Sequence, residues 1–400
     1  MSKYKKLTSL FYEDKDRHQS LYNERFHSES CTHLPLSVAG APAFFLTTSD
    51  MAVMIEKILS YNADLTQILG TLPEAALDML KEEIIIEEIM VTNDIEGVRS
   101  TRKEIADALE ASKRKDRALR FQGIVNKYVQ LLFVTEQQTI QSCQDIRDIY
   151  NEIVSQEIEK PSLPDGTIFR KDPVSIYTST DKEIHKGIFP EENLILFMEK
   201  SISILSEDIS FLIAVSVFHY LFGYAHPFYD GNGRTDRFIS SMLLNHILNP
   251  LISSRISYTI KNNKNKYQKC FELCNDPKNK GDITHFVLFF LSVIEKSAKN
   301  IHHHARELTQ KFKYYGEIIW TQTNLDREHK LALHILVQAS LFKKTGVHPK
   351  EVAGYLNKGE QTTSKILKSL VEPFHLEIIK DGKKHLYYLN LETLDALTTQ

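Results

Sequence analysis

The residues of this chain that are best suited to chemistry lie in one short stretch, from His226 to Arg237. The stretch combines one possible base, two carboxylates, two glycines, one amide side chain and two arginines. An apolar run, 209–221, precedes it, and a second apolar run, 238–248, follows it. Buried segments do not need such a polar turn for packing, whereas a site that binds a polyphosphate does.

Two glycines and two arginines give the stretch its affinity for anions. Gly231 and Gly233 let the backbone turn sharply and approach a ligand closely. Successive N–H groups in such a turn form an anion-binding nest, and a helix that begins near Gly233 adds its dipole. Arg234 and Arg237 are three residues apart, so both project from one face and offer forked donors to phosphate oxygens.

The remaining polar residues suit a metal ion and a proton transfer. Asp230 is a hard oxygen ligand for a Mg²⁺ ion that also touches phosphates, or alternatively a cap for the following helix. His226 can act as a general base near neutral pH. Asp236 is expected to be a solvated carboxylate in the first turn of the helix. Together the residues suit nucleophilic attack on a nucleotide phosphate through positioning and charge stabilisation.

The stretch resembles the signature of the Fic family. That signature reads His-Pro-Phe, any residue, Asp or Glu, Gly-Asn-Gly-Arg, two variable residues, Arg, and every fixed position matches. Most members are protein adenylyltransferases, which move AMP from ATP to a hydroxyl of a target protein, while a minority use CDP-choline or UTP or phosphorylate. The resemblance implies a mainly α fold, with a Fic-type helical bundle and a short β-hairpin flap.

The resemblance also assigns roles at the two ends of the loop. It implies that His226 deprotonates the target hydroxyl, that Phe228 anchors the loop in the core, and that Asp230 holds Mg²⁺. The expected substrate is therefore ATP. The expected partner is a protein with a Ser, Thr or Tyr hydroxyl, or the chain itself through self-modification.

The same resemblance assigns the phosphate contacts. The backbone of Gly231 and Gly233, together with Asn232, would cradle the α-phosphate. Arg234 would contact the β-phosphate and Arg237 the γ-phosphate.

A second feature lies upstream, where a helical pattern over 73–95 leads into Gly97. Thr92 and Glu96 share a face at the i,i+4 spacing, and Gly97 is a plausible helix terminator. A carboxylate in the last turn of a helix is disfavoured by the dipole. Glu96 is therefore expected either to face solvent or to find a cationic partner, for which an arginine is the natural choice.

This segment resembles the inhibitory motif of the family, which reads Ser or Thr, three residues, Glu, then Gly or Asn. Its place before the signature is that of the N-terminally inhibited class. The resemblance implies that Glu96 pairs with Arg237 and denies it to the γ-phosphate. Some members use the same Glu to remove AMP, so inhibition alone and such a dual role both remain open.

Composition is consistent with a globular, cytoplasmic protein. The chain has 400 residues, 42% of them hydrophobic, and a net charge of −3, so no global attraction to nucleic acid or membrane is expected. It has no N-terminal apolar run typical of a signal peptide and no run long enough to span a bilayer. The four cysteines form no disulfide framework.

The pattern along the chain predicts three domains: an N-terminal arm and helices with the inhibitory helix (1–125), a Fic catalytic core (126–312), and a winged-helix-like domain (326–400). Residues before Gly40 are expected to form a polar, irregular arm. Thr101 and Glu104 are expected to form a capping box. Helices are expected over 50–68, 73–95, 102–113, 116–132, 142–153, 191–205, 209–225, 233–248, 265–274 and 283–312.

Between Pro164 and Pro190 the pattern changes to strand and turn signals. Residues 169–171 and 174–177 favour strand and 178–181 favour a turn, so a short hairpin is expected, with an irregular loop as the alternative. In the Fic family a flap lies here beside the active site, and the target backbone adds to its edge. Ile176 and Tyr177 are the candidates for that edge.

The C-terminal pattern resembles a winged-helix module. Helices are expected over 327–342, 349–356 and 361–370, followed by a hairpin of 376–379 with 385–389. Such a module could bind DNA, which would make the chain a DNA-binding regulator with a Fic sensor domain. Its acidic residues make protein docking or homodimer formation an equal alternative. The residues expected on the recognition helix are Thr362, Thr363, Lys365 and Lys368.

Overall fold

The computed structural model describes residues 4–114, 119–134, 138–177, 183–343, 346–381 and 384–396. Most of these residues are helical, and the described strands pair into three two-stranded sheets, which confirms the expectation of a mainly α protein. Contacts divide the chain into two compact units, Met1–Asn62 with Ile85–Lys299 and Ala63–Ile84 with Asn300–Gln400. The domain boundaries expected from the sequence remain predictions. None of the described helices combines the length and apolar character needed to cross a membrane.

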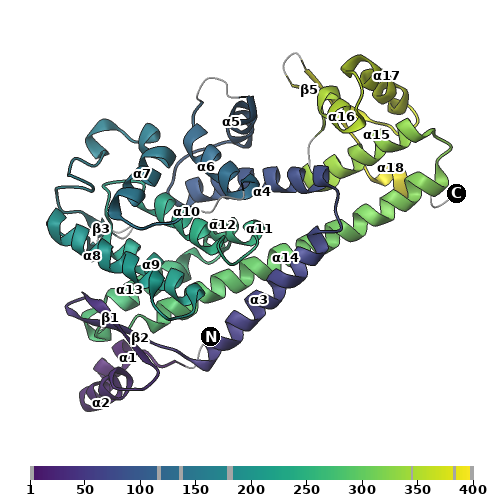
Figure 1. Ribbon diagram of the computed structural model, residues 1–400. Helices are drawn as coiled ribbons and strands as arrows, with labels where there is room; N and C mark the ends of the chain where they lie inside the picture. Colours follow the sequence, from purple (N-terminus) through teal and green to yellow (C-terminus); the bar gives the residue numbers. More distant parts are fainter. Residues whose placement is uncertain are drawn as a thin grey trace. The chain divides into compact units, whose positions relative to one another are not determined.

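The core of the first unit is built around α9 (Phe211–Ala225). Every residue of this helix except Phe211 and Gly223 is buried, because its sequence is apolar on all sides. α8 (Glu191–Ser203) and α10 (Asn232–Leu244) pack against it (Figure 1). The polar stretch therefore lies in the turn between the two helices α9 and α10 and in the first turns of α10.

Most helices expected from apolar spacing are present, with ends within two residues of those predicted. α14 continues well beyond its expected end, α10 ends at Leu244 and not at 248, α6 starts later than expected, and the short helices α11 and α12 were not predicted. The expected capping box is also present: Thr101 and Glu104 exchange hydrogen bonds of 2.8 and 3.2 Å. The helices are α3 (Ser49–Leu69), α4 (Glu74–Ile95), α5 (Arg102–Arg114), α6 (Gln122–Phe133), α7 (Cys143–Ile153), α11 (Pro250–Ser253), α12 (Ile256–Lys261), α13 (Lys264–Asn275) and α14 (Thr284–Gln322).

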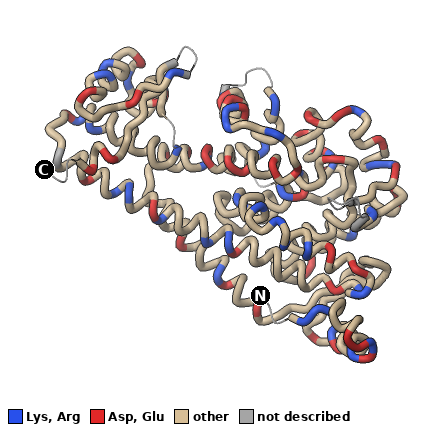
Figure 2. The backbone as a smooth tube through the Cα atoms, turned by 180° about the vertical axis from the view of Figure 1, so that it is seen from behind, with Lys and Arg blue, Asp and Glu red and all other residues tan. Residues whose placement is uncertain are grey.

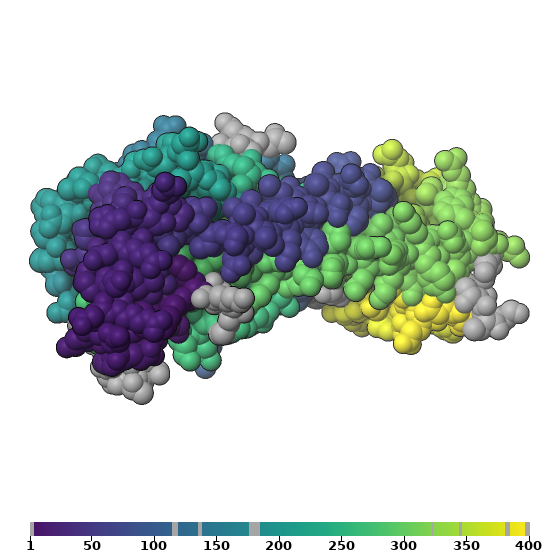
Figure 3. Space-filling model, turned by 90° about the horizontal axis from the view of Figure 1, so that it is seen from below, coloured from purple at the N-terminus to yellow at the C-terminus, as the bar shows by residue number. Residues whose placement is uncertain are grey.

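The prediction of an irregular N-terminal arm is wrong. These residues form α1 (Leu7–Glu13), α2 (Lys15–Phe26) and a hairpin of β1 (Cys31–Val38) with β2 (Ala41–Leu46). Alternate residues of β1 are buried, which is the pattern of a half-buried strand, and Pro35 obscured it in the sequence. Figure 3 shows these purple elements lying against the teal part of the same unit. Arg25 pairs with Asp282, just before α14, at 3.1 Å.

The expected hairpin between Pro164 and Pro190 is present, but its strands differ from those predicted. β3 (Ser175–Tyr177) pairs antiparallel with β4 (Glu183–Lys186), and the expected turn at 178–181 lies outside the described residues. The predicted strand at 169–171 is wrong, because this segment is bent and does not pair as a strand. Its backbone is held instead by the carboxylate of Glu191, which accepts N–H groups of residues 167, 168 and 169 at 2.8–2.9 Å.

The C-terminal part contains the expected helices and hairpin. Figure 2 shows acidic and basic segments interspersed along it. Thr363 is fully buried, so among the residues named for a recognition helix it cannot face a ligand, while Thr362, Lys365 and Lys368 are exposed. A winged-helix function remains a prediction. The elements are α15 (Arg327–Gln338), a π-helical turn (Ala339–Lys343), α16 (Pro349–Leu356), α17 (Glu360–Val371), β5 (Glu377–Asp381), β6 (Lys384–Tyr388) and α18 (Glu392–Asp395).

Phe228 anchors the turn after α9 in the core of the first unit. Its side chain is fully buried. The ring stacks on that of Tyr150 with centroids 3.8 Å apart, and it meets Phe169 edge-on at 5.6 Å. The loop therefore depends on this aromatic cluster.

We expect Phe228→Ala to lower the free energy of unfolding by about 3–5 kcal/mol, because it empties a large buried site. Urea denaturation followed by circular dichroism measures this loss. Leu196→Ala on α8 is the control, since that side chain is 51% exposed and its loss should stay below about 1 kcal/mol. Equal losses in the two variants would contradict the anchoring role.

Candidate active site

The turn between α9 and α10 places His226 at the C-terminal end of one helix and Gly231 at the start of the next. His226 adopts a left-handed conformation with φ 52° and ψ 63°, which is unusual for a residue with a side chain. The loop is closed by Asn232, whose amide donates to the Phe228 carbonyl at 2.7 Å and accepts from the Phe228 N–H at 2.9 Å. The Asn232 side chain therefore shapes the loop, and only its backbone N–H points to an anion role.

Both glycines of the loop are required by close contacts. Gly231 has φ +82°, and a Cβ there would lie 2.9 Å from Val154. A Cβ on Gly233 would lie 2.1 Å from an oxygen of Glu96 and 2.8 Å from Nη1 of Arg237. The absence of a side chain at 233 therefore opens the space in which the acid and the arginine meet.

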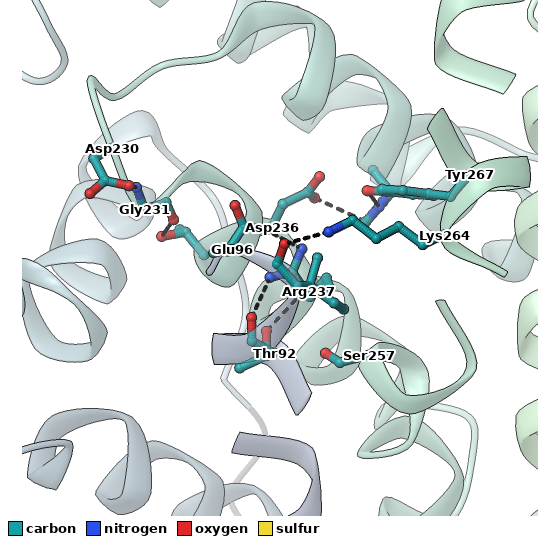
Figure 4. Close-up of polar contacts among 12 residues, drawn as sticks. Thr92, Glu96, Asp230, Gly231, Asp236, Arg237, Ser257, Lys264 and Tyr267 are labelled. Carbon is teal, nitrogen blue, oxygen red and sulfur yellow. Dashed lines mark hydrogen bonds and ion pairs between the residues drawn. The ribbon is translucent and has the colours of Figure 1, made fainter. Parts of the chain in front are cut away.

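The side chain of Arg237, on α10, contacts the C-terminal part of α4 (Figure 4). Its guanidinium is buried, and three of its nitrogens donate to two residues of the α4 segment. Nε donates to Thr92 Oγ1 at 2.9 Å, Nη2 to the Thr92 carbonyl at 3.1 Å, and Nη1 to Glu96 at 2.8 Å. The expected pairing of Glu96 with an arginine is therefore present in the structure.

The electrostatics favour this ion pair. Burial alone would raise the pKa of the Glu96 carboxyl, but the charge and the hydrogen bond of Arg237 outweigh it, so this pKa lies below its ordinary value. Since the folded-state pKa is depressed, the pair is complete above the ordinary glutamate pKa and is lost only as pH falls through the lower one.

The end of α4 is held by further contacts from α12 and α13. Asp94 pairs with Lys261 at 2.8 Å, and Lys264 donates to the Ile95 carbonyl at 3.0 Å. Gly97 ends the segment with φ +73°, as its role as a helix terminator requires. These contacts set Glu96 just beyond the helix, facing α10.

Arg234 also pairs with an acid, which the sequence did not reveal. Its Nη1 donates to Glu157 at 2.9 Å, and both side chains are largely buried. Burial raises the pKa of Glu157, although the neighbouring Arg234 acts in the opposite direction. Glu157 lies in a short 3-10 turn, Ser155–Glu157, where no periodic pattern marks it.

Asp236 is not a solvated carboxylate, so that expectation is wrong. It is 2% exposed, and its Oδ1 lies 3.1 Å from Nδ1 of His219. The His219 ring also contacts Ser240 at 2.7 Å and Tyr267 at 2.7 Å. α10 is buried on this side as well, so its first turn offers no solvated face.

The imidazole of His226 is held in its neutral form. Burial lowers its pKa to about 4, and the positive charge of Arg170 and of His185 acts in the same direction, while Glu96 opposes them. The residue as a whole is partly exposed. A neutral, accessible imidazole can accept a proton at physiological pH.

Asp230 is the exposed carboxylate of the loop. It does not cap α10, whose N-cap is Gly231 without a side-chain bond; it accepts the N–H of its neighbour Gly231 at 2.5 Å. Within the described residues no group of three His, Cys, Asp or Glu side chains is arranged to bind a metal. A single carboxylate still suits Mg²⁺, which is commonly held by one or two carboxylates together with substrate phosphates.

The flap residues Ile176 and Tyr177 lie in β3, as expected for a hairpin edge. Ile176 pairs with His185 and Tyr177 with Glu183 of β4. Their role in docking a target remains a prediction.

Residues 141–244 match the Fic/DOC family. This segment, from the start of α7 to the end of α10, is therefore a Fic/DOC family domain. It contains the complete loop from His226 to Arg237. Thr92 and Glu96 lie outside it, so the acid that meets Arg237 comes from a part of the chain that the family match does not cover.

Several solved structures are similar to this chain. One is a Fic family protein from Desulfovibrio desulfuricans G20, with a TM-score of 0.49 and 17% identity, covering 86% of this chain and 97% of that one. A Fic domain containing signaling protein from Bacteroides thetaiotaomicron VPI-5482 has a TM-score of 0.42 and 18% identity, covering 65% and 97%. Fic-1 from C. elegans (residues 134–508) has a TM-score of 0.40 and 16% identity, covering 64% and 73%.

We expect Thr92→Val to lower the free energy of unfolding by about 1–3 kcal/mol, because the nearly isosteric change leaves the Arg237 Nε–H buried without its acceptor. Thermal and urea denaturation measure the loss. Thr167→Val is the control, because that residue is exposed. A Thr92 variant as stable as the control would show that the hydroxyl does not support the buried guanidinium.

Proposed function

We propose that this chain is a protein adenylyltransferase, which transfers AMP from ATP to a hydroxyl side chain of a target protein or of itself, and that Glu96 inhibits it. Fic/DOC domains generally transfer AMP or a related nucleotidyl group, and residues 141–244 match that family. The observation that carries the proposal is the contact of Glu96 with Arg237 at 2.8 Å. Through this contact the carboxylate of Glu96 pairs with one of the two arginines that are suited to binding a polyphosphate.

In the proposed reaction His226 accepts the proton of the target hydroxyl as its oxygen attacks the α-phosphorus of ATP. A new oxygen–phosphorus bond forms, the bond to the β-phosphate oxygen breaks, and pyrophosphate leaves with the electron pair. The low pKa of His226, about 4, keeps the ring free to accept the proton at neutral pH. Positioning and charge stabilisation supply the catalysis.

The residues of the loop fit a polyphosphate. Gly231 turns the backbone into the N-terminus of α10, where N–H groups lack intrahelical partners. The buried Nε of Arg234 has no hydrogen-bond partner among the described residues, so this guanidinium has donor capacity beyond the contact with Glu157. Asp230 would hold Mg²⁺, which would neutralise phosphate charge when bound.

Glu96 accounts for inhibition in electrostatic terms. Its carboxylate occupies Nη1 of Arg237, and the γ-phosphate of a productively bound ATP would need the same donor. A phosphate placed beside Glu96 would also meet a like charge. ATP would therefore bind in an unproductive pose until Glu96 is displaced.

We expect Glu96→Gly to raise AMP transfer by about 10- to 100-fold, because one charge-assisted hydrogen bond to the phosphate is worth roughly 1.5–3 kcal/mol. The wild type, Glu96→Gly and the double variant with His226→Ala are incubated with Mg²⁺, a cell lysate as the acceptor source, and ATP labelled at the α- or the γ-phosphate. Protein-bound α-label without γ-label identifies AMP transfer, and the double variant should retain none.

The matched control is Glu13→Gly, which removes a glutamate from the last position of α1 and should leave the rate at the wild-type level. Retained γ-label would instead identify phosphorylation. A rate in Glu96→Gly no higher than in the wild type would argue against inhibition. Label only from another nucleotide would overturn the assignment of ATP.

The low pKa of His226 predicts a flat pH profile. With an ordinary histidine pKa of 6.5 the base would be protonated progressively below that pH, whereas a pKa of about 4 keeps it neutral. We expect kcat/KM of Glu96→Gly to change less than about twofold between pH 8 and about pH 5.5, as measured by initial rates in a series of buffers. Glu96 raises the pKa of His226, so its loss lowers this pKa and extends the plateau to lower pH. A tenfold loss between these two pH values would contradict the pKa shift.

A further inference from the structure

Another buried arginine, Arg170, contacts the backbone of His226. Arg170 is 1% exposed, and all four of its described acceptors are backbone carbonyl oxygens. They belong to Asp172 at 2.7 Å, His226 at 2.8 Å, Ile188 at 2.9 Å and Ala225 at 3.3 Å. None of the described carboxylates forms an ion pair with Arg170. Burying a cation without a counter-charge costs folding free energy, so the buried position of Arg170 needs an explanation.

The reason lies in the backbone that Arg170 holds. His226 has a positive φ, and it precedes Pro227, a position that favours extended backbone. Local preference therefore opposes the observed conformation, which costs on the order of 1–3 kcal/mol. Carbonyls at the end of α9 also lack intrahelical donors. Arg170 supplies donors to two of them and places a positive charge at the negative end of the helix dipole.

The same guanidinium ties the hairpin β3–β4 to this turn. Asp172 and Ile188 lie at its two ends, and both present their carbonyls to Arg170. The Ile188 N–H also donates to the Ala225 carbonyl at 3.1 Å. A Cβ on Gly187 would lie 2.3 Å from Nη2 of Arg170. The guanidinium therefore occupies the space that a side chain at position 187 would fill.

We propose that Arg170 is a positioning residue for the general base: its guanidinium holds His226 in the left-handed turn and fixes the base of the flap against it. This inference rests on the proposed function, since it takes His226 as the base. Arg170 touches neither ATP nor the target hydroxyl in this account, and it acts through the backbone of His226.

The charge of Arg170 has a consequence that can be measured apart from activity. After burial, Arg170 is the strongest of the groups that lower the pKa of His226; His185 acts in the same direction and Glu96 in the opposite one. Removing the charge at 170 should therefore raise the pKa of His226, while a lysine there should keep it low. A residue that only stabilised the fold would show no such dependence on charge.

The test compares Arg170→Met, Arg170→Lys and Arg147→Met. Arg147 is the matched control, because it donates to the carbonyls of Ile168 at 2.6 Å and Pro164 at 3.4 Å but contacts neither Ala225 nor His226. AMP transfer is measured in the Glu96→Gly background. The imidazole titration of His226 is followed by NMR with Glu96 intact, and its signal is assigned through His226→Ala.

For Arg170→Met we expect kcat to fall about 100-fold, with KM for ATP within about threefold, because a base displaced by about 1 Å costs this much. The pKa of His226 should rise from about 4 towards the ordinary 6.5. Arg170→Lys should lose kcat and keep the low pKa, because it retains the charge but not the forked donors. Arg147→Met should keep both quantities.

A kcat in Arg170→Met within about threefold of its background, together with an unchanged pKa of His226, would overturn the proposal. If Arg170→Met does not fold, Arg170→Lys decides by its kcat: a loss with unchanged KM supports positioning, and no loss refutes it. If no variant transfers AMP, the proposed function fails, yet the titration still decides: a raised pKa in Arg170→Met supports the positioning role and an unchanged pKa refutes it.

Discussion

The buried guanidinium of Arg237 is the interaction on which the site depends. A cation that is 1% exposed needs partners for its donors, and the segment of α4 supplies them through Thr92 and Glu96. The contact joins α4 to α10 within the first unit and places an acid beside the loop that we propose binds phosphate. Stability and the proposed inhibition would therefore depend on the same hydrogen bonds, because a phosphate that binds Arg237 would have to displace contacts that satisfy its buried donors.

The loop itself is held from three directions. Phe228 fixes it to the aromatic core, the Asn232 amide closes it, and Arg170 holds its first carbonyls. These contacts impose a left-handed backbone on His226 against the local preference of a residue before proline. The loop is thus preorganised at the position where the proposed chemistry needs a neutral base.

Predictions from local sequence patterns were correct where local interactions determine the structure. Apolar spacing located most helices, since a helix buries one face or all of it, whereas the anion site inferred from the composition of the loop remains a prediction. Predictions were wrong where contacts with residues distant in the sequence determine the structure. Asp236 is buried against His219, and residues 167–169 are held by Glu191 instead of a neighbouring strand. In the N-terminal part Pro35 obscured a strand whose burial alternates only once β2 pairs with it.

The sequence by itself determined the chemical parts and their order: a base, a carboxylate, two glycines and two arginines in one turn, and an acid with a threonine four residues before it. The resemblance to the Fic family already implied that Glu96 meets Arg237, and the tertiary structure decided the other contacts. Arg237 contacts Glu96 across 141 positions and Arg234 contacts Glu157 across 77, and Arg170 reaches His226 across 56. Such pairs depend on how buried helices pack and which charges are removed from water together, and no local spacing encodes that.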